Sequence, residues 1–126
     1  MSSFTDPLTV TKIGPRLWKV ARAFRYYVGS ENSSEFIDIP EGFETDFASV
    51  PRGLWNICPP DGQYTQAAVV HDYLYTYHRY DRKRSDEIFL EAMQVLGVPR
   101  WRRYAMFWAV RLFGQGSYDK KAFNNE

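Results

Sequence analysis

Residues 67–75 read Ala-Ala-Val-Val-His-Asp-Tyr-Leu-Tyr, and their apolar positions recur at the spacing of an α-helix. The recurring positions fall at i, i+1, i+4, i+7 and i+8, and one of them is a histidine. These positions are Ala67, Ala68, His71, Leu74 and Tyr75. Because Thr65 is a suitable N-cap residue, the pattern predicts a helix whose inward face carries an imidazole.

Two further helices are predicted after this one. The second starts near Ser85 and closes at Gly97, and its inward face extends back to Asp86. Its inward apolar residues are Ile88, Phe89, Ala92, Met93 and Leu96. The third begins at Pro99 and ends at Gly114. Its large side chains at helical spacing are Trp101, Tyr104, Ala105, Trp108 and Leu112.

Upstream of these helices the apolar period is two, which is typical of strands. In residues 17–28 the side chains on one face are Trp18, Val20, Phe24, Tyr26 and Val28, and Arg22 interrupts that face. Turn-forming residues follow at 29–34, and residues 35–39 have strand-like composition. The pair predicts a β-hairpin with a long loop.

Residues 40–64 are rich in proline and glycine but also in large apolar side chains, which predicts a long, ordered and packed loop. The fold class expected is therefore α+β, with a small N-terminal β-hairpin or sheet, this loop, and three C-terminal α-helices. At 126 residues and 14.8 kDa, we expect one domain spanning residues 1–126.

The composition excludes several classes of protein. The formal net charge is +1, so no specific nucleic-acid partner is predicted. Cys58 is the only cysteine, which excludes internal disulfides and metal sites made of several thiolates. No apolar run is long enough to cross a bilayer, so no transmembrane segment is expected.

Three arginines, Arg100, Arg102 and Arg103, stand at the start of the third predicted helix. Positive charge opposes the helix dipole there, so we expect these side chains to have anionic partners. Internal carboxylates, nucleic-acid phosphates, lipid headgroups and a neighbouring subunit all remain open, beside an ordinary solvated face.

His71 and Asp86 are the candidate catalytic pair. If they meet, the carboxylate fixes the imidazole tautomer and raises the basicity of the other ring nitrogen, as a general base acting on water requires. Asp72, expected at a groove edge, could then bind a hard cation with loop carbonyls. A helix starting at Ser85 leaves Asp86 opposite the end of the first helix, so spacing alone leaves open whether the pair meets. The alternative is a buried pair that only holds two helices together.

Asp46 and Ser49 are further candidates for lining a pocket with His71. Their other interpretation is side-chain capping of loop amides, the commoner role of such residues in turns. A Ser49–His71–Asp86 triad can also be written, but the chain lacks a nucleophile-elbow motif around Ser49.

Four segments together resemble an uncharacterised family of phage and prophage proteins. They are GFETDFASVPR at 42–52, GQY at 62–64, AAVVHDYLY at 67–75 and SDEIFLEAM at 85–93. This resemblance implies a phage or prophage origin, with the host cytoplasm or the assembled virion as location. It implies no established activity.

Residues 67–93 also resemble the phospholipase A2 superfamily, whose catalytic helix carries His-Asp followed three residues later by Tyr, with a later Asp on a partner helix. The matching positions are His71, Asp72, Tyr75 and Asp86. The resemblance implies that His71 activates water, Asp86 orients His71 and Asp72 holds calcium. A proline-rich stretch at residues 55–62 stands where that superfamily has a glycine-rich calcium loop.

Two functions follow as expectations. The first is a phage-encoded hydrolase of an ester or similar bond in a lipid or cell-envelope substrate. The second is a non-catalytic virion or tail component that contacts other virion subunits, in which the His-Asp pair holds the fold. The high content of Tyr, Trp and Arg is typical of protein interfaces. A small host-directed binding protein is a third class left open.

Overall fold

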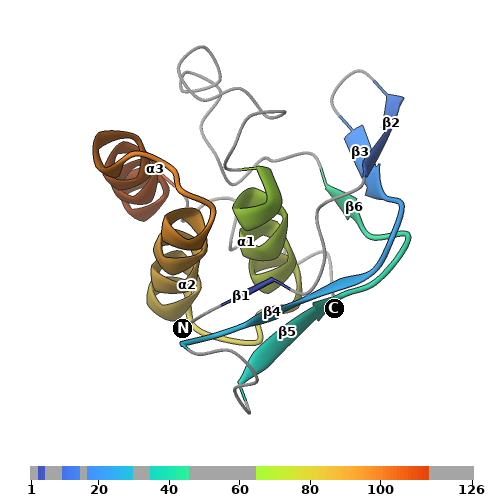
Figure 1. Ribbon diagram of the computed structural model, residues 1–126, viewed down its shortest axis with the longest axis horizontal. Helices are drawn as coiled ribbons and strands as arrows, with labels where there is room; N and C mark the ends of the chain where they lie inside the picture. The colour runs from blue at the N-terminus through green and yellow to red at the C-terminus, as the bar shows by residue number, and fades with distance from the viewer. Residues whose placement is uncertain (1–2, 5–9, 15–16, 30–34, 46–64, 114–126) are drawn as a thin grey trace. The chain divides into compact units, whose positions relative to one another are not determined.

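The computed structural model describes residues 3–4, 10–14, 17–29, 35–45 and 65–113. Its contacts divide the chain into two compact units, Met1–Asp46 and Phe47–Glu126. The described strands belong to the first unit and the described helices to the second (Figure 1). The expected class, α+β with N-terminal strands and three C-terminal helices, is confirmed. The expectation of a single domain over residues 1–126 stays a prediction.

The first unit contains two small antiparallel sheets. One has the strand order β1-β4-β5, with β1 at Ser3–Phe4, β4 at Phe24–Tyr27 and β5 at Phe36–Ile39. The other has the order β2-β3-β6, with β2 at Val10–Gly14, β3 at Leu17–Val20 and β6 at Glu44–Thr45. The predicted hairpin is therefore the β4–β5 pair, in which Phe24 lies opposite Ile39.

The single strand-like run predicted at 17–28 is divided between the two sheets. β3 ends at Val20 and β4 begins at Phe24, so the break falls around Arg22, where the alternating pattern was interrupted. Val20 pairs with β2, and its amide also donates to the Phe43 carbonyl. Val20, Phe24, Tyr26 and Val28 are buried as predicted. Alternate side chains along a strand point to the same face, and the even-numbered residues keep that face on both sides of the break.

The proline-rich loop predicted at 40–64 is described only as far as Thr45. There the chain turns at Gly42, whose φ of +91° is accessible to glycine at little cost, and forms the two-residue strand β6. The rest of the predicted loop, including Asp46 and Ser49, lies outside the described residues.

In the second unit, helix α1 spans Thr65–Tyr77 and is buried on almost every side through Tyr75. All five predicted inward residues are buried. The helix ends at Tyr77, and the next residue, His78, has a left-handed φ of +52° that stops further helical hydrogen bonding. A helix that is apolar nearly all round is the kind found in the centre of a core, and this burial encloses both His71 and Asp72.

Helix α2 spans Arg82–Val95, so the predicted start at Ser85 was wrong by three residues. The physical reason is the N-cap: the Asp81 side chain accepts a hydrogen bond of 2.7 Å from the Arg84 amide and allows the basic residues to enter the first turn. The inward residues are as predicted at Ile88, Phe89, Ala92 and Met93. Gly97, with φ of +79°, follows the helix end as expected.

Helix α3 spans Arg100–Phe113 and packs against α2, which also packs against α1. The residues that α3 buries are Met106 and Val110. The large side chains predicted at helical spacing therefore lie on its solvent side, since they occupy the opposite face. No helix among the described residues is long and apolar enough to cross a membrane.

Candidate functional site

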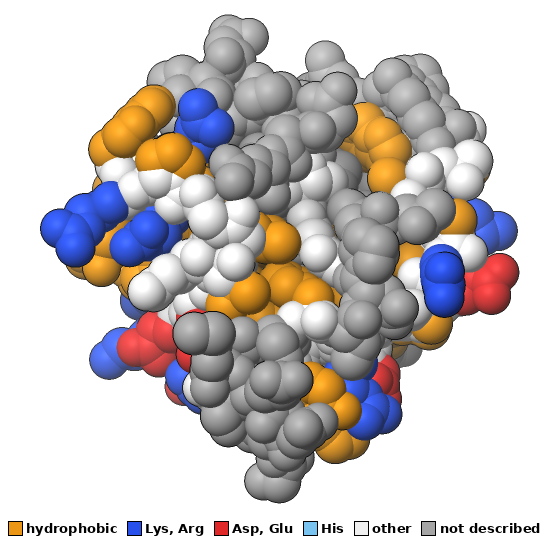
Figure 2. All heavy atoms as spheres, viewed as in Figure 1, with side chains coloured by type: hydrophobic (Ala, Val, Ile, Leu, Met, Phe, Trp, Pro, Cys, Tyr) orange, Lys and Arg blue, Asp and Glu red, His pale blue; other side chains and the backbone are white. Residues whose placement is uncertain are grey.

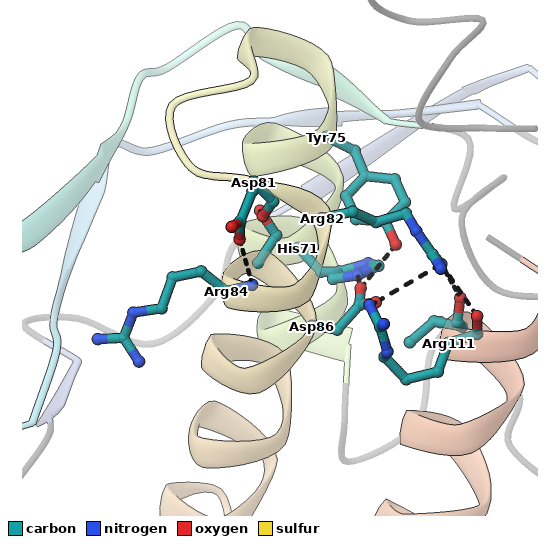
Figure 3. Close-up of polar contacts among 9 residues, drawn as sticks. His71, Tyr75, Asp81, Arg82, Arg84, Asp86 and Arg111 are labelled. Carbon is teal, nitrogen blue, oxygen red and sulfur yellow. Dashed lines mark hydrogen bonds and ion pairs between the residues drawn. The ribbon is translucent and has the colours of Figure 1, made fainter. Parts of the chain in front are cut away.

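One carboxylate, that of Asp86 on α2, receives hydrogen bonds from two side chains of α1. His71 Nε2 lies 2.6 Å from Asp86 Oδ1, and the Tyr75 hydroxyl lies 2.6 Å from the same oxygen (Figure 3). An ionised carboxylate only accepts hydrogen bonds, so both partners donate and His71 carries a proton on Nε2. Asp86 thereby fixes the tautomer and the orientation of the imidazole.

His71 and Asp86, whose contact the sequence spacing left open, do meet, because α2 begins before the predicted start at Ser85. The connection between α1 and α2 is short, which makes the two helices antiparallel neighbours. Starting at Arg82 rather than Ser85 moves Asp86 one turn into α2. The carboxylate then lies opposite the last two turns of α1, within reach of His71 and Tyr75.

The other carboxylate oxygen of Asp86 faces two arginines. Arg111 Nη1 on α3 donates to Asp86 Oδ2 over 3.0 Å, and Arg82 Nη1 lies 3.8 Å from the same oxygen (Figure 3). Arg82 Nη1 also donates to the carbonyls of Val110 and Arg111, each over 3.0 Å. Those carbonyls belong to the last turn of α3, where helix geometry leaves acceptors unsatisfied and a cation is favourable. Asp86 therefore connects all three helices.

These groups are shielded from solvent. The side chains of both His71 and Asp86 are 0% exposed. The His71 ring contacts the Tyr75 ring at a centroid distance of 4.2 Å and the Phe89 ring at 4.6 Å. Such burial strengthens the hydrogen bonds and restricts the imidazole to one rotamer.

The balance of forces on Asp86 keeps it ionised. Burial is the largest single influence and opposes the charge, but hydrogen bonds from His71, Tyr75 and Arg111, with the attraction of His71, outweigh it. The pKa of Asp86 is therefore lowered from its ordinary value. Burial and the hydrogen bond to Asp86 raise the pKa of Tyr75 above its ordinary value, so its hydroxyl remains a donor.

The structure brings together three of the residues predicted from the sequence, His71, Tyr75 and Asp86. Asp72 is next to His71 on α1, but it is buried, so the expected position at a groove edge was wrong. The reason is that α1 is enclosed on nearly all sides. Asp46 and Ser49 lie outside the described residues, so their pocket and capping interpretations, and the Ser49 triad, stay predictions.

Sequence reasoning missed Arg82 and Arg111 as partners of Asp86. Arg82 had a signal that could have been used, since it precedes Asp86 by four residues and this spacing brings charged side chains together on a helix. Arg111 is 25 residues from Asp86. No local pattern identifies such a contact.

A calcium site requires several oxygen ligands, commonly six to eight. Asp72 has the right donor chemistry, a carboxylate beside His71. Among the described residues, however, no group of three or more His, Cys, Asp or Glu side chains could hold a metal ion. The described part of the chain therefore shows no cluster of metal-binding side chains at Asp72, and calcium binding there stays a prediction.

Comparisons with known proteins give a family and no activity. A family model described as "Protein of unknown function (DUF1353)" matches residues 18–110, which include both sheets in part and nearly all of the three helices. The curated "Uncharacterized protein y4jT" of Sinorhizobium fredii (strain NBRC 101917 / NGR234) is 36% identical over 78 residues. That match covers 60% of this chain but only 23% of the relative, so the chain corresponds to less than a quarter of that protein.

No solved structure matches the chain significantly. The family match spans most of the sequence and includes the α1–α2 pair that carries His71, Tyr75 and Asp86. The chain belongs to the DUF1353 family of proteins of unknown function.

Proposed function

We propose that this chain is a phage- or prophage-encoded hydrolase that uses His71 as a general base on an ester or similar bond of a lipid or cell-envelope substrate. The observation that carries the proposal is the contact of His71 Nε2 with the ionised Asp86 over 2.6 Å. A carboxylate that accepts a hydrogen bond from one imidazole nitrogen makes the other ring nitrogen more basic. The phage or prophage origin rests on the motif resemblance alone.

In the proposed reaction, Nδ1 of His71 takes a proton from water while the water oxygen attacks the ester carbonyl carbon. The imidazolium that forms is stabilised by Asp86, which stays unprotonated. The ester C–O bond then breaks, and the departing alkoxide takes the proton back from Nδ1. Tyr75 and Arg111 act as positioning residues, because they hold the carboxylate and do not touch the substrate.

The resemblance to the phospholipase A2 superfamily supports this assignment. That resemblance implies a helix with His-Asp and a Tyr three residues later, next to a helix with an Asp. Here Tyr75 and His71 share one oxygen of Asp86. No step of the proposed reaction passes through calcium, since the described residues contain no group of three or more His, Cys, Asp or Glu side chains that could hold a metal ion.

The proposal is tested by screening ester and phospholipid substrates with wild type and His71→Asn. We expect hydrolysis by the wild type and a loss of at least about a hundredfold in the variant, the usual contribution of a general base. Circular dichroism and a cooperative thermal transition show whether the variant is folded. Equal rates in a folded His71→Asn protein would contradict the proposal.

A matched variant separates catalysis from folding. Tyr75→Phe removes one hydrogen bond to Asp86 and leaves His71 in place, so we expect a folded protein with a moderately reduced rate and a shifted pH–rate profile. His78→Asn is the control histidine, since His78 lies at the end of α1, outside the Asp86 contacts. It should leave turnover unchanged.

Full burial of His71 and Asp86 favours a second candidate, a non-catalytic virion or tail component. In this function the contacts of Asp86 with three helices serve only to stabilise the fold. Mass spectrometry of purified particles tests it: detection of the chain at subunit stoichiometry is expected. Its absence from particles, together with turnover by the wild type, would exclude this candidate.

Calcium binding by Asp72 has its own test. We expect calcium to raise the thermal unfolding temperature of the wild type, because a ligand bound to the folded state alone adds RT ln(1 + [L]/Kd) to its stability. Asp72→Asn should abolish the increase. No shift between calcium and chelator in the wild type would contradict the prediction and leave the proposed reaction unaffected.

A further inference from the structure

Four large apolar side chains lie exposed along one face of α3. We call them the α3 row: Trp101, Tyr104, Trp108 and Leu112, with exposed fractions of 61%, 43%, 57% and 70%. Single exposed apolar side chains are ordinary on a protein surface, but a contiguous set indicates an interaction site. Figure 2 shows hydrophobic and basic side chains side by side over α3, at the left of the view.

The row is a continuous surface. At about 100° and 1.5 Å per residue, its members lie within an arc of about 80° and extend over about 16 Å along the helix. The opposite side of α3 buries Met106 and Val110 against the rest of its unit. The packing of α3 onto α2 therefore does not use the row.

Positive charge flanks the row. α3 contains four arginines and no acidic residue. At the same 100° spacing, Arg100 and Arg102 fall on the two sides of the row. The Arg102 guanidinium lies 5.4 Å from the ring centre of Trp101, and that of Arg103 lies 5.8 Å from the ring centre of Tyr104.

These arginines carry charge that the described structure does not neutralise. Within the described part of the chain, no ion pair joins Arg100, Arg102 or Arg103 to a carboxylate. Arg103 donates instead to the neutral carbonyl of Val98 over 3.1 Å. Arg100 and Arg102 therefore present positive charge beside the row, which suits an anionic partner of α3.

We propose that α3 docks on the surface of an anionic phospholipid bilayer, lying in the plane of the headgroups with the row toward the acyl chains. Tryptophan and tyrosine suit the boundary between headgroups and acyl chains, leucine suits the acyl side, and arginines bind the phosphates. At 14 residues, α3 lies on the bilayer and does not span it.

A second copy of the chain fits this surface less well. In a symmetric contact between two α3 rows, the arginines of one helix face those of the other, with no acidic residue in either helix to pair with them. Nucleic acid also fits less well, because Leu112, the most exposed member of the row, is aliphatic and cannot stack on a base.

Bilayer docking does not depend on hydrolysis, because none of the four residues of the row has a role in the proposed reaction. Arg111 nevertheless joins α3 to Asp86, so docking would place the bilayer against the helix that supplies one hydrogen bond to the candidate site. Vesicle binding and turnover are measured separately, so either proposal can fail alone.

Vesicle flotation tests the docking. The full chain is mixed with vesicles of phosphatidylcholine alone or of phosphatidylcholine and phosphatidylglycerol in equal parts, at low and high salt. We expect binding to the anionic vesicles only, accompanied by a blue shift of tryptophan fluorescence, and weakened by salt.

Variants locate the contact. Trp101→Ser combined with Trp108→Ser should weaken binding about tenfold or more, and Arg100→Gln combined with Arg102→Gln should reduce the dependence on anionic lipid. Ile13→Ser is the matched control, since Ile13 is an exposed apolar residue of the N-terminal unit. It should bind as the wild type does, as should His71→Asn.

Three outcomes would overturn the proposal. They are no binding to anionic vesicles, unchanged binding by the folded double tryptophan variant, and equal binding to neutral vesicles. Sedimentation that shows a dimer abolished by the same variant, without vesicle binding, would assign the row to a second copy. Binding of an oligonucleotide lost in that variant, again without vesicle binding, would assign it to nucleic acid.

Discussion

Among the described residues, an arginine–aspartate ion pair of the N-terminal unit and one of the helical unit differ in environment rather than in chemistry. In the N-terminal unit, Arg25 and Asp38 form a two-pronged contact on the β4–β5 hairpin, with distances of 2.6 and 3.1 Å. In the helical unit, Arg111 binds Asp86 over 3.0 Å. The Asp38 side chain is 57% exposed, and that of Asp86 is 0% exposed.

Two ion pairs of similar contact geometry therefore contribute very differently to stability, because burial and not distance sets the cost of losing a partner. The hydrogen bonds that Arg25 donates to Asp38 raise the pKa of Arg25 above its ordinary value, yet water screens both groups and the pair contributes little to stability. The Asp86 side chain is fully buried, so removing one of its partners leaves a charge shielded from solvent, and each group around it contributes to stability.

Asp86→Ala should destabilise the protein by about 3–5 kcal/mol, because it leaves Arg111 and the buried polar groups of α1 without their acceptor. Urea unfolding followed by circular dichroism measures the change. Ile88→Val, a change of one methylene on the same helix, is the control and should cost about 1 kcal/mol. A loss below about 1 kcal/mol for Asp86→Ala would mean that the buried pair is no more important than the exposed one.

Lowering the pH should reduce the free energy of unfolding by part of the amount that Asp86→Ala removes. Because the pKa of Asp86 is lower in the folded than in the unfolded state, the folded protein binds fewer protons. Its contribution is therefore present above the unfolded pKa, near 4, and disappears as the pH falls through the folded pKa. Unfolding free energies measured over a pH series should fall more steeply toward acid for the wild type than for Asp86→Asn, and parallel curves would contradict the prediction.

Tyr75→Phe should cost about 1.5–3 kcal/mol, the contribution of one hydrogen bond to a charged group. The pKa of Tyr75 is raised in the folded state, so its contribution is present below the unfolded tyrosine pKa and is lost only as the pH rises past it. Tyr77→Phe, on the same helix but exposed, is the matched control and should change stability little. Equal effects of the two substitutions would show that the Asp86 contact adds nothing.

The smallest effect is expected for Asp38→Ala. The Arg25 side chain keeps its contact with the Phe36 ring, at 3.9 Å from the ring centre, after the carboxylate is removed. Thermal unfolding should therefore show almost no change in the transition temperature, and that change should vanish at high salt. A loss comparable with that of Asp86→Ala would break the distinction between the two pairs.

Much of the secondary structure could be predicted because its signals are local. The inward faces of α1 and α2 follow from spacing, and the β4–β5 hairpin follows from parity and turn composition. Apolar spacing did not give the start of α2, since that boundary depends on one capping contact of Asp81. The division of residues 17–28 between two sheets depends on long-range pairing, which spacing does not encode.

The residue types of the candidate site follow from the sequence alone: a histidine and a tyrosine lie one turn apart on one helix face, and an aspartate lies on the inward face of the next helix. Only the tertiary structure shows that the Asp86 carboxylate accepts hydrogen bonds from both of them and from Arg111, 25 residues away along the chain. It also shows that Asp72 is buried. It also decided which side of α3 faces solvent. Helical periodicity identifies the two faces of an amphipathic helix, but only packing against neighbouring elements selects the buried one.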